Sequence, residues 1–482
     1  MSKGVRALLA ALVSTTLFAG AQAHAAPVVD VDMSCVAPAG DPAPNTPEWI
    51  QRDTNNQNCA GERIRDQLVN PAFGWGNITE GDRQYVEQMF DQAGDLNHPR
   101  GGVTTLIPGS KAADPYRTIK RWTEAGLGRV SPVSFPALNG ATLRGHVFAP
   151  PASVPEPKGG YPGVVITDGS IQAFEELYFW AAEDLASEGY LVMTYDVQGQ
   201  GDSDLLGSDC SDPTNPPASG SCSGVPYQQN YNFYQGAEDS LSFFLSDKNP
   251  WADHLDRDKV GIAGHSLGAA AVTRVGQCDT RVKAIVAWDN LGAITDCSGV
   301  TVPKQFQPEK DHLIHTPALA LSNDYAFNTQ PTLSAPDPHA KDAGFQQLAK
   351  AGVDSQLVVF RGATHLTYTY IDLVFQANEL SERMASYYTT SWFDRYLKHK
   401  DGAFERLTAK KFDDLADKHS IGAGIYDPSL ADPGDKFSGN VPYKIAGINV
   451  QDAVSFYYLS EYAIHDPHGD KLVTCGDVRK GC

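Results

Sequence analysis

The sequence predicts an α/β protein built on a doubly wound, mostly parallel sheet of about eight strands, with an extension at each end of the chain. From Arg129 onward, short β-branched segments alternate with longer amphipathic ones, which is typical of parallel strands connected by helices. Several short segments are almost continuously apolar, as in strands that helices cover on both faces. With 482 residues, of which 41% are hydrophobic, the chain can form a large core.

The first 25 residues are predicted to be a secretory signal peptide. Lys3 and Arg6 precede an apolar run over 7–20, and Ala23-His24-Ala25 fits the small-x-small pattern of a cleavage site. A membrane anchor is the alternative, but this run is shorter than the roughly 20 residues that a spanning helix needs. We therefore expect a secreted, extracellular protein with no membrane span.

Two regions flank the expected sheet. Residues 26–127 are rich in Pro, Asn, Asp and Gly, and we expect them to wrap on the core as an N-terminal extension. Residues 128–408 hold the alternating segments and form the predicted core domain. Residues 409–482 include a stretch rich in Gly, Pro and Asp and end in two cysteines, so we expect a C-terminal extension closed by a disulfide.

Within the core domain, each expected strand is a short apolar or β-branched segment. The expected strands are 129–135, 141–149, 162–169, 190–196, 259–266, 283–289, 317–324 and 355–363. The expected helices are 175–189, 267–276, 339–352 and 381–399. Two opening strands followed by strict alternation indicate a doubly wound sheet, in which ligands bind at the carboxyl ends of the strands.

The eight cysteines fall as four neighbouring pairs, an arrangement that favours local disulfides in an exported chain. The expected bonds are Cys35–Cys59, Cys210–Cys222, Cys278–Cys297 and Cys475–Cys482, although other connectivities are open to eight cysteines. A metal site is the alternative. The chain has no C-x-x-C pair and no histidines at matching spacing, so we expect no metal.

The formal net charge of −20 argues against nucleic acids and anionic membrane surfaces as partners. The sequence does not reveal the oligomeric state, and we expect a monomer.

A candidate nucleophile lies in the segment Gly264-His265-Ser266-Leu267-Gly268, between an expected strand and an expected helix. A strand–turn–helix of this kind exposes the serine hydroxyl on a sharp bend at the carboxyl end of the strand. The small residues at 264 and 268 allow the two backbones to approach closely. The helix N-terminus then faces a developing oxyanion, and the Leu267 N–H is placed to donate to it. The alternative is an ordinary helix cap, because serine and glycine are common at helix starts.

A serine of this kind needs a histidine base that a carboxylate orients. Asp324 ends the seventh expected strand and His365 follows the eighth, so the chain order is serine, acid, histidine. Asp289 ends the sixth strand and is the alternative acid. Position favours Asp324, because the strand that follows it carries the histidine loop.

These segments resemble the α/β-hydrolase superfamily over residues 129–400. The resemblance is carried by GHSLG (264–268), DVQGQGDSD (196–204), AWDN (287–290), GATH (362–365) and WFDRYLK (392–398). The last three are similar to segments of secreted polyester hydrolases of the cutinase-like and dienelactone-hydrolase-like branches.

The resemblance implies an α/β-hydrolase fold and further site residues. A second oxyanion donor is implied at the Ser170 N–H, with Gly169 allowing the turn. Trp288 corresponds to the tryptophan that lines the acyl pocket in those enzymes, and His265 and Gly169 are expected to lie beside it.

The sequence therefore predicts a secreted serine hydrolase that cleaves small-molecule or polymeric carboxylic esters through Ser266, His365 and Asp324, without a cofactor. An exopeptidase or amidase with the same triad is one alternative. A non-catalytic binding protein on this fold is the other.

Overall fold

The computed structural model describes residues 42–69, 117–170, 173–205, 230–289, 291–309, 312–332, 334–370, 376–417 and 444–482, with shorter stretches between them. The signal peptide of residues 1–25 and the pair Cys210 and Cys222 lie outside the described residues.

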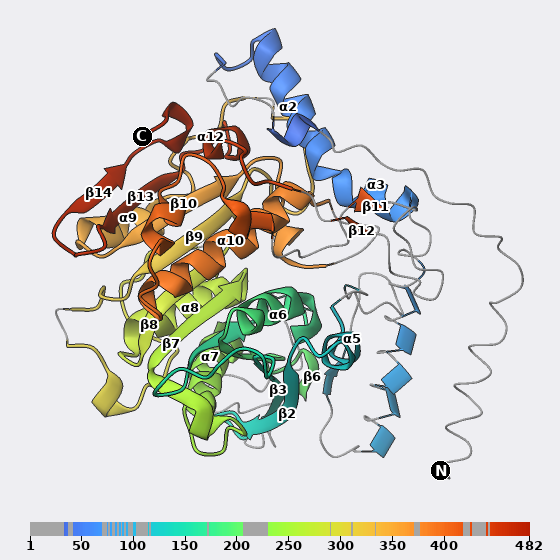
Figure 1. Ribbon diagram of the computed structural model, residues 1–482, viewed down its shortest axis with the longest axis vertical. Helices are drawn as coiled ribbons and strands as arrows, with labels where there is room; N and C mark the ends of the chain where they lie inside the picture. Colours follow the sequence, from blue (N-terminus) through green and yellow to red (C-terminus); the bar gives the residue numbers. More distant parts are fainter. Residues whose placement is uncertain are drawn as a thin grey trace, which may run out of the picture.

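The main sheet has ten strands in the order β14-β13-β10-β9-β8-β7-β4-β5-β3-β2 (Figure 1). Their bounds are β2 (Arg129–Pro136), β3 (Thr142–Ala149), β4 (Tyr161–Thr167), β5 (Leu191–Tyr195), β7 (Leu255–His265), β8 (Val282–Trp288), β9 (Ala318–Asn323), β10 (Ser355–Phe360), β13 (Glu461–His465) and β14 (Leu472–Cys475). Two further antiparallel pairs form separate two-stranded sheets, β1 (Arg100–Gly102) with β6 (Gly201–Asp204) and β11 (Ile425–Tyr426) with β12 (Asn440–Val441).

All eight expected strands are present, but the expected number is corrected from about eight to ten. The additional strands, β13 and β14, come from the segment that we expected to be a C-terminal extension. β13 pairs antiparallel with β10, with Ser355 opposite Ala463, and β14 pairs antiparallel with β13. This hairpin covers the edge that β10 would otherwise expose.

The α-helices are α2 (Pro47–Ala60), α3 (Glu62–Val69), α5 (Ile119–Glu124), α6 (Phe179–Ser187), α7 (Asn230–Phe244), α8 (Leu267–Cys278), α9 (Ala343–Lys350), α10 (Glu379–Tyr396), α11 (Ala403–Leu407) and α12 (Val450–Ala453). Short 3₁₀ helices include η1 (Met33–Val36), η2 (Glu175–Tyr178), η3 (Ala252–His254), η4 (Lys304–Phe306), η5 (His365–Tyr368), η6 (Asp414–Asp417) and η8 (Val478–Lys480).

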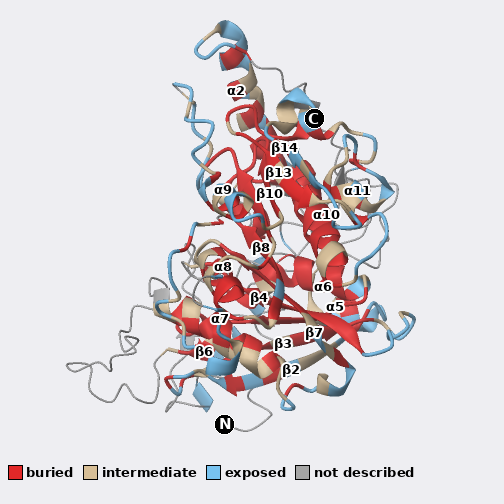
Figure 2. Cartoon of the chain, turned by 90° about the vertical axis from the view of Figure 1, so that its left-hand side faces the viewer, coloured by how far each residue is buried: buried red, intermediate tan, exposed pale blue. Residues whose placement is uncertain are grey.

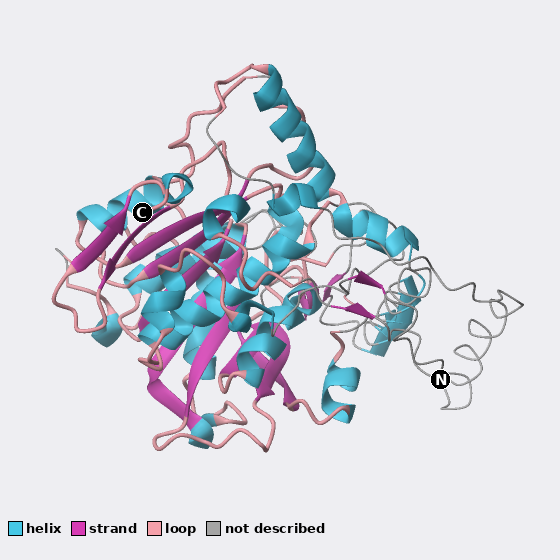
Figure 3. Ribbon diagram, turned by 45° about the horizontal axis from the view of Figure 1, so that its top comes forward, coloured by secondary structure: helices cyan, strands magenta, loops and turns pink. Residues whose placement is uncertain are grey.

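Helices cover both faces of the sheet, whose central strands are buried (Figures 2 and 3). One hydrophobic cluster joins the sheet to α6 and α10, and a second joins it to α7, α8 and α9. Strand periodicity divides the side chains between the two clusters. On β4, Val164 and Ile166 belong to the first cluster, whereas Val165 between them belongs to the second. This explains why the parallel strands are almost continuously apolar.

Helix α2, which was not among the expected helices, follows a strong start signal. The Thr46 side chain accepts a hydrogen bond from Trp49 N, and Pro47 occupies the first helical position. The helix packs on the loop after β10: a Cβ at Gly362, where φ is +62°, would lie 3.0 Å from both Asn56 O and Cys59 Sγ. The N-terminal region therefore contacts the loop that carries His365.

Three of the expected cysteine pairs are bonded: Cys35–Cys59, Cys278–Cys297 and Cys475–Cys482. The second pair requires the chain after β8 to return along α8. Arg274 of α8 holds this return, because its guanidinium donates to Asp296 O at 2.8 Å and Ser298 O at 3.0 Å. Within the described residues, no helix is sufficiently long and apolar to span a bilayer, and no group of three or more His, Cys, Asp or Glu side chains could hold a metal ion.

Candidate active site

The loops that follow the parallel strands meet at one edge of the sheet, because the strand ends are in register. Thr167 of β4 lies beside Gly264 of β7, and His265 lies beside Trp288 of β8. Asn323 of β9 lies beside Phe360 of β10. The next residues along the chain therefore gather at this edge, as expected for a doubly wound sheet.

Ser266 forms a sharp turn between β7 and α8. Its φ of 57° and ψ of −118° lie in a region that few non-glycine residues adopt. The Ser266 N–H donates to Trp288 O at 3.0 Å. A Cβ at Gly264 would lie 2.6 Å from Gly268 O, and one at Gly268 would lie 2.2 Å from Asp168 O. The two glycines are therefore required for the close approach of strand and helix.

His365 lies between the serine and a carboxylate. Its Nε2 is 2.8 Å from Ser266 Oγ, and its Nδ1 is 2.6 Å from Asp289 Oδ2. The backbone N–H of His365 donates to the backbone oxygen of Ala326 at 2.7 Å, which fixes the histidine loop against the segment after β9. The ring of Phe327, 47% exposed, meets the His365 ring edge-on, with centroids 4.9 Å apart.

The prediction that Asp324 orients His365 is wrong in this structure, and the alternative residue Asp289 takes that place. Asp324 Oδ2 instead accepts hydrogen bonds from Asn56 Nδ2 and from Gly362 N, both at 2.8 Å. The Asp289 carboxylate reaches His365 from a turn with φ of 39°, and its other oxygen accepts from Ser322 Oγ at 2.8 Å. The two carboxylates therefore serve different neighbours.

The environments of the two carboxylates shift their pKa values in opposite directions. Burial acts to raise the pKa of Asp289, but the hydrogen bond and charge of His365, with Lys341 and Ser322, hold it well below its usual range. Burial raises the pKa of Asp324 to about 6, although hydrogen bonds and Arg361 partly oppose that rise. Asp289 is therefore the group that stays ionised beside the imidazole.

Of the two residues expected to donate to an oxyanion, Leu267 directly follows the serine in the chain, and Ser170 follows Gly169, which approaches the serine. Leu267 is the first residue of α8, and Ser170 lies three residues after Thr167, the last residue of β4. A Cβ at Gly169 would lie 3.3 Å from Ser266 Cβ, so this loop lies directly against the nucleophile. The Gly169 N–H already donates to Tyr178 Oη at 3.0 Å.

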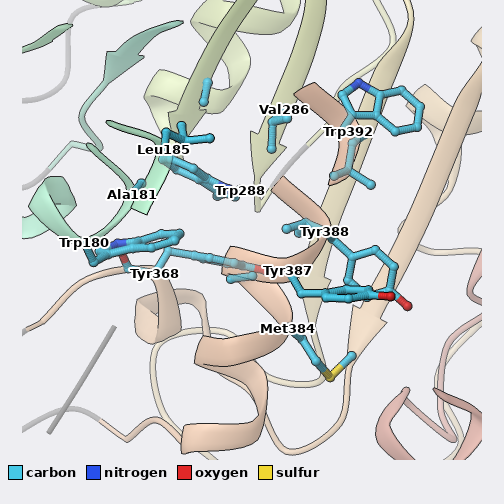
Figure 4. Close-up of a cluster of buried hydrophobic side chains, with 14 of the residues drawn as sticks. Trp180, Ala181, Leu185, Val286, Trp288, Tyr368, Met384, Tyr387, Tyr388 and Trp392 are labelled. Carbon is cyan, nitrogen blue, oxygen red and sulfur yellow. The ribbon is translucent and has the colours of Figure 1, made fainter. Parts of the chain in front are cut away.

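The expected pocket positions of Trp288 and His265 are corrected, because both side chains are buried. Trp288 is 0% exposed, and its Nε1 donates to Thr389 Oγ1 at 3.0 Å. It packs against Trp180 and Tyr368 in the aromatic cluster shown in Figure 4, with ring centroids 5.2 and 6.5 Å away. His265 is 2% exposed, and both of its ring nitrogens have hydrogen-bond partners.

Three residues at the site escaped the sequence analysis. Ser322 bonds Asp289, Tyr178 bonds both Gly169 and His265, and Phe327 contacts His365. Ser322 lies two positions before Asp324 in the expected strand 317–324, so period-two alternation could have placed both on one face. Tyr178 and Phe327 carry no comparable signal.

No family model matches the chain. Alpha/beta hydrolase xenA of Xenoacremonium sinensis is 31% identical over 190 residues, which are 39% of this chain and 40% of that relative. Alpha/beta hydrolase psoB of Aspergillus fumigatus is 26% identical over 216 residues, or 45% of this chain and 43% of the relative. Alpha/beta hydrolase ucsC of an Acremonium species is 30% identical over 145 residues, which are 30% of this chain and 26% of that relative. Each match spans less than half of the relative, and all three relatives are named alpha/beta hydrolases.

Proposed function

We propose that the chain is an exported serine hydrolase of carboxylic esters, with Ser266 as nucleophile, His365 as general base and acid, and Asp289 as the acid that orients the histidine. One observation carries the proposal. Ser266 Oγ, the two nitrogens of His365 and Asp289 Oδ2 form one line of hydrogen bonds, 2.8 and 2.6 Å long. This is the arrangement that activates a serine hydroxyl.

Acylation begins when Ser266 Oγ attacks the acyl carbon of the ester and its proton passes to Nε2 of His365. The C–O bond to the alcohol then breaks, and the leaving oxygen takes that proton. In deacylation a water molecule gives a proton to Nε2 of His365 and attacks the acyl carbon. The bond from the acyl carbon to Ser266 Oγ then breaks, Nε2 returns the proton to Oγ, and the carboxylic acid leaves. Asp289 stays ionised throughout and stabilises the imidazolium.

The oxyanion is proposed to lie between the Leu267 and Ser170 N–H groups. The position of Leu267 at the start of the 12-residue helix α8 supports its part, because the helix dipole favours negative charge there. The approach of Gly169 to Ser266 supports the part of Ser170, the next residue along the chain.

Two lines of support favour an ester as substrate and export from the cytoplasm. The GATH and AWDN segments resemble those of secreted polyester hydrolases, of the cutinase-like and dienelactone-hydrolase-like branches. The three disulfides among the described residues are typical of an oxidising compartment. A small-molecule or polymeric ester needs no cofactor for this chemistry.

The test is a panel of p-nitrophenyl esters of increasing acyl length beside aminoacyl anilides. We expect ester turnover, covalent labelling of Ser266 by an organophosphonate, and loss of turnover by about 10⁴-fold or more in Ser266→Ala, because triad members act as a unit. Preference for the anilides would indicate an exopeptidase or amidase. Full labelling of the alanine variant, or no turnover of either substrate class, would refute the proposal.

A further inference from the structure

A second set of hydrogen bonds, through Tyr178 and His265, connects the loop after β4 to the loop after β10. We call it the line. The Gly169 N–H donates to the Tyr178 hydroxyl at 3.0 Å. That hydroxyl lies 2.9 Å from Nδ1 of His265, and Nε2 of His265 lies 2.7 Å from the backbone oxygen of His365. The line therefore connects the loop before Ser170 to the residue that faces Ser266.

The chemistry of the groups fixes the direction of each bond. A carbonyl oxygen can only accept, so Nε2 of His265 carries a hydrogen and donates it to His365 O. Burial, and then the nearby His365, lower the pKa of His265 to about 3. The ring is therefore neutral near pH 7, and Nδ1 accepts from the Tyr178 hydroxyl, which accepts from Gly169 N–H.

We propose that Tyr178 and His265 are positioning residues, which hold the Gly169–Ser170 loop and the His365 loop in place on either side of Ser266. The inference rests on the proposed function, in which the Ser170 N–H receives the oxyanion and His365 moves the proton. Misplacing either loop weakens transition-state stabilisation, because donors and base act at fixed distances.

The burial of these side chains determines which kinetic constant responds. Tyr178 is 0% exposed and His265 is 2% exposed, so neither side chain offers a surface to the substrate. Loss of the line should therefore lower kcat and leave KM for a short ester nearly unchanged.

The test uses Tyr178→Phe, which removes the central hydroxyl, and His265→Asn, which keeps an acceptor near Nδ1 but deletes the donor to His365. Tyr190→Phe is the matched control. Tyr190 is also 0% exposed and belongs to the same hydrophobic cluster as Tyr178, but its hydroxyl donates to Asp394 at 2.9 Å. Rates are measured with p-nitrophenyl butyrate, per active site titrated with a phosphonate.

We expect kcat to fall on the order of 10-fold in each line variant, less than the 10²–10³-fold known for deleting an oxyanion donor outright. KM should change less than about 2-fold, and the Tyr178→Phe/His265→Asn double variant should lose little more than the worse single variant, because both cut one line. Tyr190→Phe should keep its kcat.

Unchanged kcat in both line variants, or equal losses in Tyr190→Phe, would overturn the inference while leaving ester hydrolysis in place. If Tyr178→Phe does not fold, His265→Asn alone decides on the same criteria.

A second measurement separates this inference from the proposed function. The Nε2–H of His265 should give a slowly exchanging NMR signal from pH 5 to 8, which disappears in His265→Asn. Absence of that signal refutes the line. Its presence in a protein that hydrolyses no ester supports the line and refutes the proposed function.

Discussion

Replacing Asp289 by asparagine should lower ester turnover by about 10²–10⁴-fold, which is about 3–5 kcal/mol of transition-state stabilisation. The geometry of the carboxylate explains the size of the loss. Ser322 Oγ donates to Asp289 Oδ1 at 2.8 Å, so in the variant the amide oxygen should stay on that side. The amide NH₂ then faces Nδ1 of His365, 2.6 Å from the present carboxylate oxygen. The imidazole would adopt the tautomer whose Nε2 carries a hydrogen and cannot accept the serine proton.

Asp324→Asn is the matched comparison, because it makes the same chemical change one strand away. Asp324 Oδ2 accepts from Asn56 and from Gly362 N, and an amide oxygen can accept both bonds. We expect turnover to stay within about 3-fold of the unaltered protein, since no bond to His365 is lost.

The raised pKa of Asp324 predicts a pH effect on the stability of the unaltered protein, which Asp324→Asn should lack. Burial raises the pKa of Asp324 to about 6 in the folded protein, against about 3.9 in an unfolded chain. The folded state therefore binds this proton more tightly. Its stabilising contribution is full below about pH 4 and is lost as pH rises to about 6, a change of about 3 kcal/mol. Asp324→Asn should remove this component of the pH dependence.

The assay is kcat/KM on p-nitrophenyl butyrate per phosphonate-titrated site, with urea unfolding at pH 4 to 7. A larger loss in Asp324→Asn than in Asp289→Asn would refute the assignment of the acid to β8. An identical pH dependence of unfolding free energy in Asp324→Asn and the unaltered protein would refute the role of burial at Asp324.

Two further predictions concern the scaffold of the site. Gly268→Ala should lower turnover by about 100-fold or more, because the added Cβ would lie 2.2 Å from Asp168 O. Gly292→Ala is the control and should keep its turnover, because a Cβ there has no atom within 4 Å. Equal activities of the two variants would contradict the close approach of strand and helix. The Cys278→Ser/Cys297→Ser double variant should lose about 3 kcal/mol of unfolding free energy and keep its kcat. Urea unfolding measures the loss, and an unchanged unfolding curve would show that the disulfide adds no stability.

The core strands could be predicted from the sequence because each is a local apolar run between turn residues. The hairpin of β13 and β14 could not, since its place depends on a pairing between Ser355 and Ala463, more than a hundred residues apart. β14 is only four residues long, with the pattern LVTC, and such a segment carries little periodicity. Strand existence is a local property, whereas the partner of an edge strand is a tertiary one.

At the site, the sequence predicted the serine and histidine because each requires a particular local setting, a Gly-rich elbow and a loop after a strand. The acid requires only a carboxylate after a neighbouring strand, and both Asp289 and Asp324 meet that condition. Trp288 was expected in the pocket because it corresponds to the tryptophan that lines the acyl pocket in the enzymes that the chain resembles. Its indole points instead into the layer between sheet and α10, where Thr389 accepts its N–H.

The place of the acid and the docking of the N-terminal region are connected through Asp324. One oxygen of this carboxylate binds both Asn56 of α2 and the Gly362 N–H, three residues before His365. Arg361 Nε donates to the oxygen of the same Asn56 side chain at 2.9 Å. Asn56 of α2 therefore bonds Asp324, which follows β9, and Arg361, which follows β10. Nδ1 of His365 bonds Asp289 Oδ2 instead, at 2.6 Å. With Asp289 orienting His365 from β8, Asp324 is left to join α2 to the loop that carries the histidine.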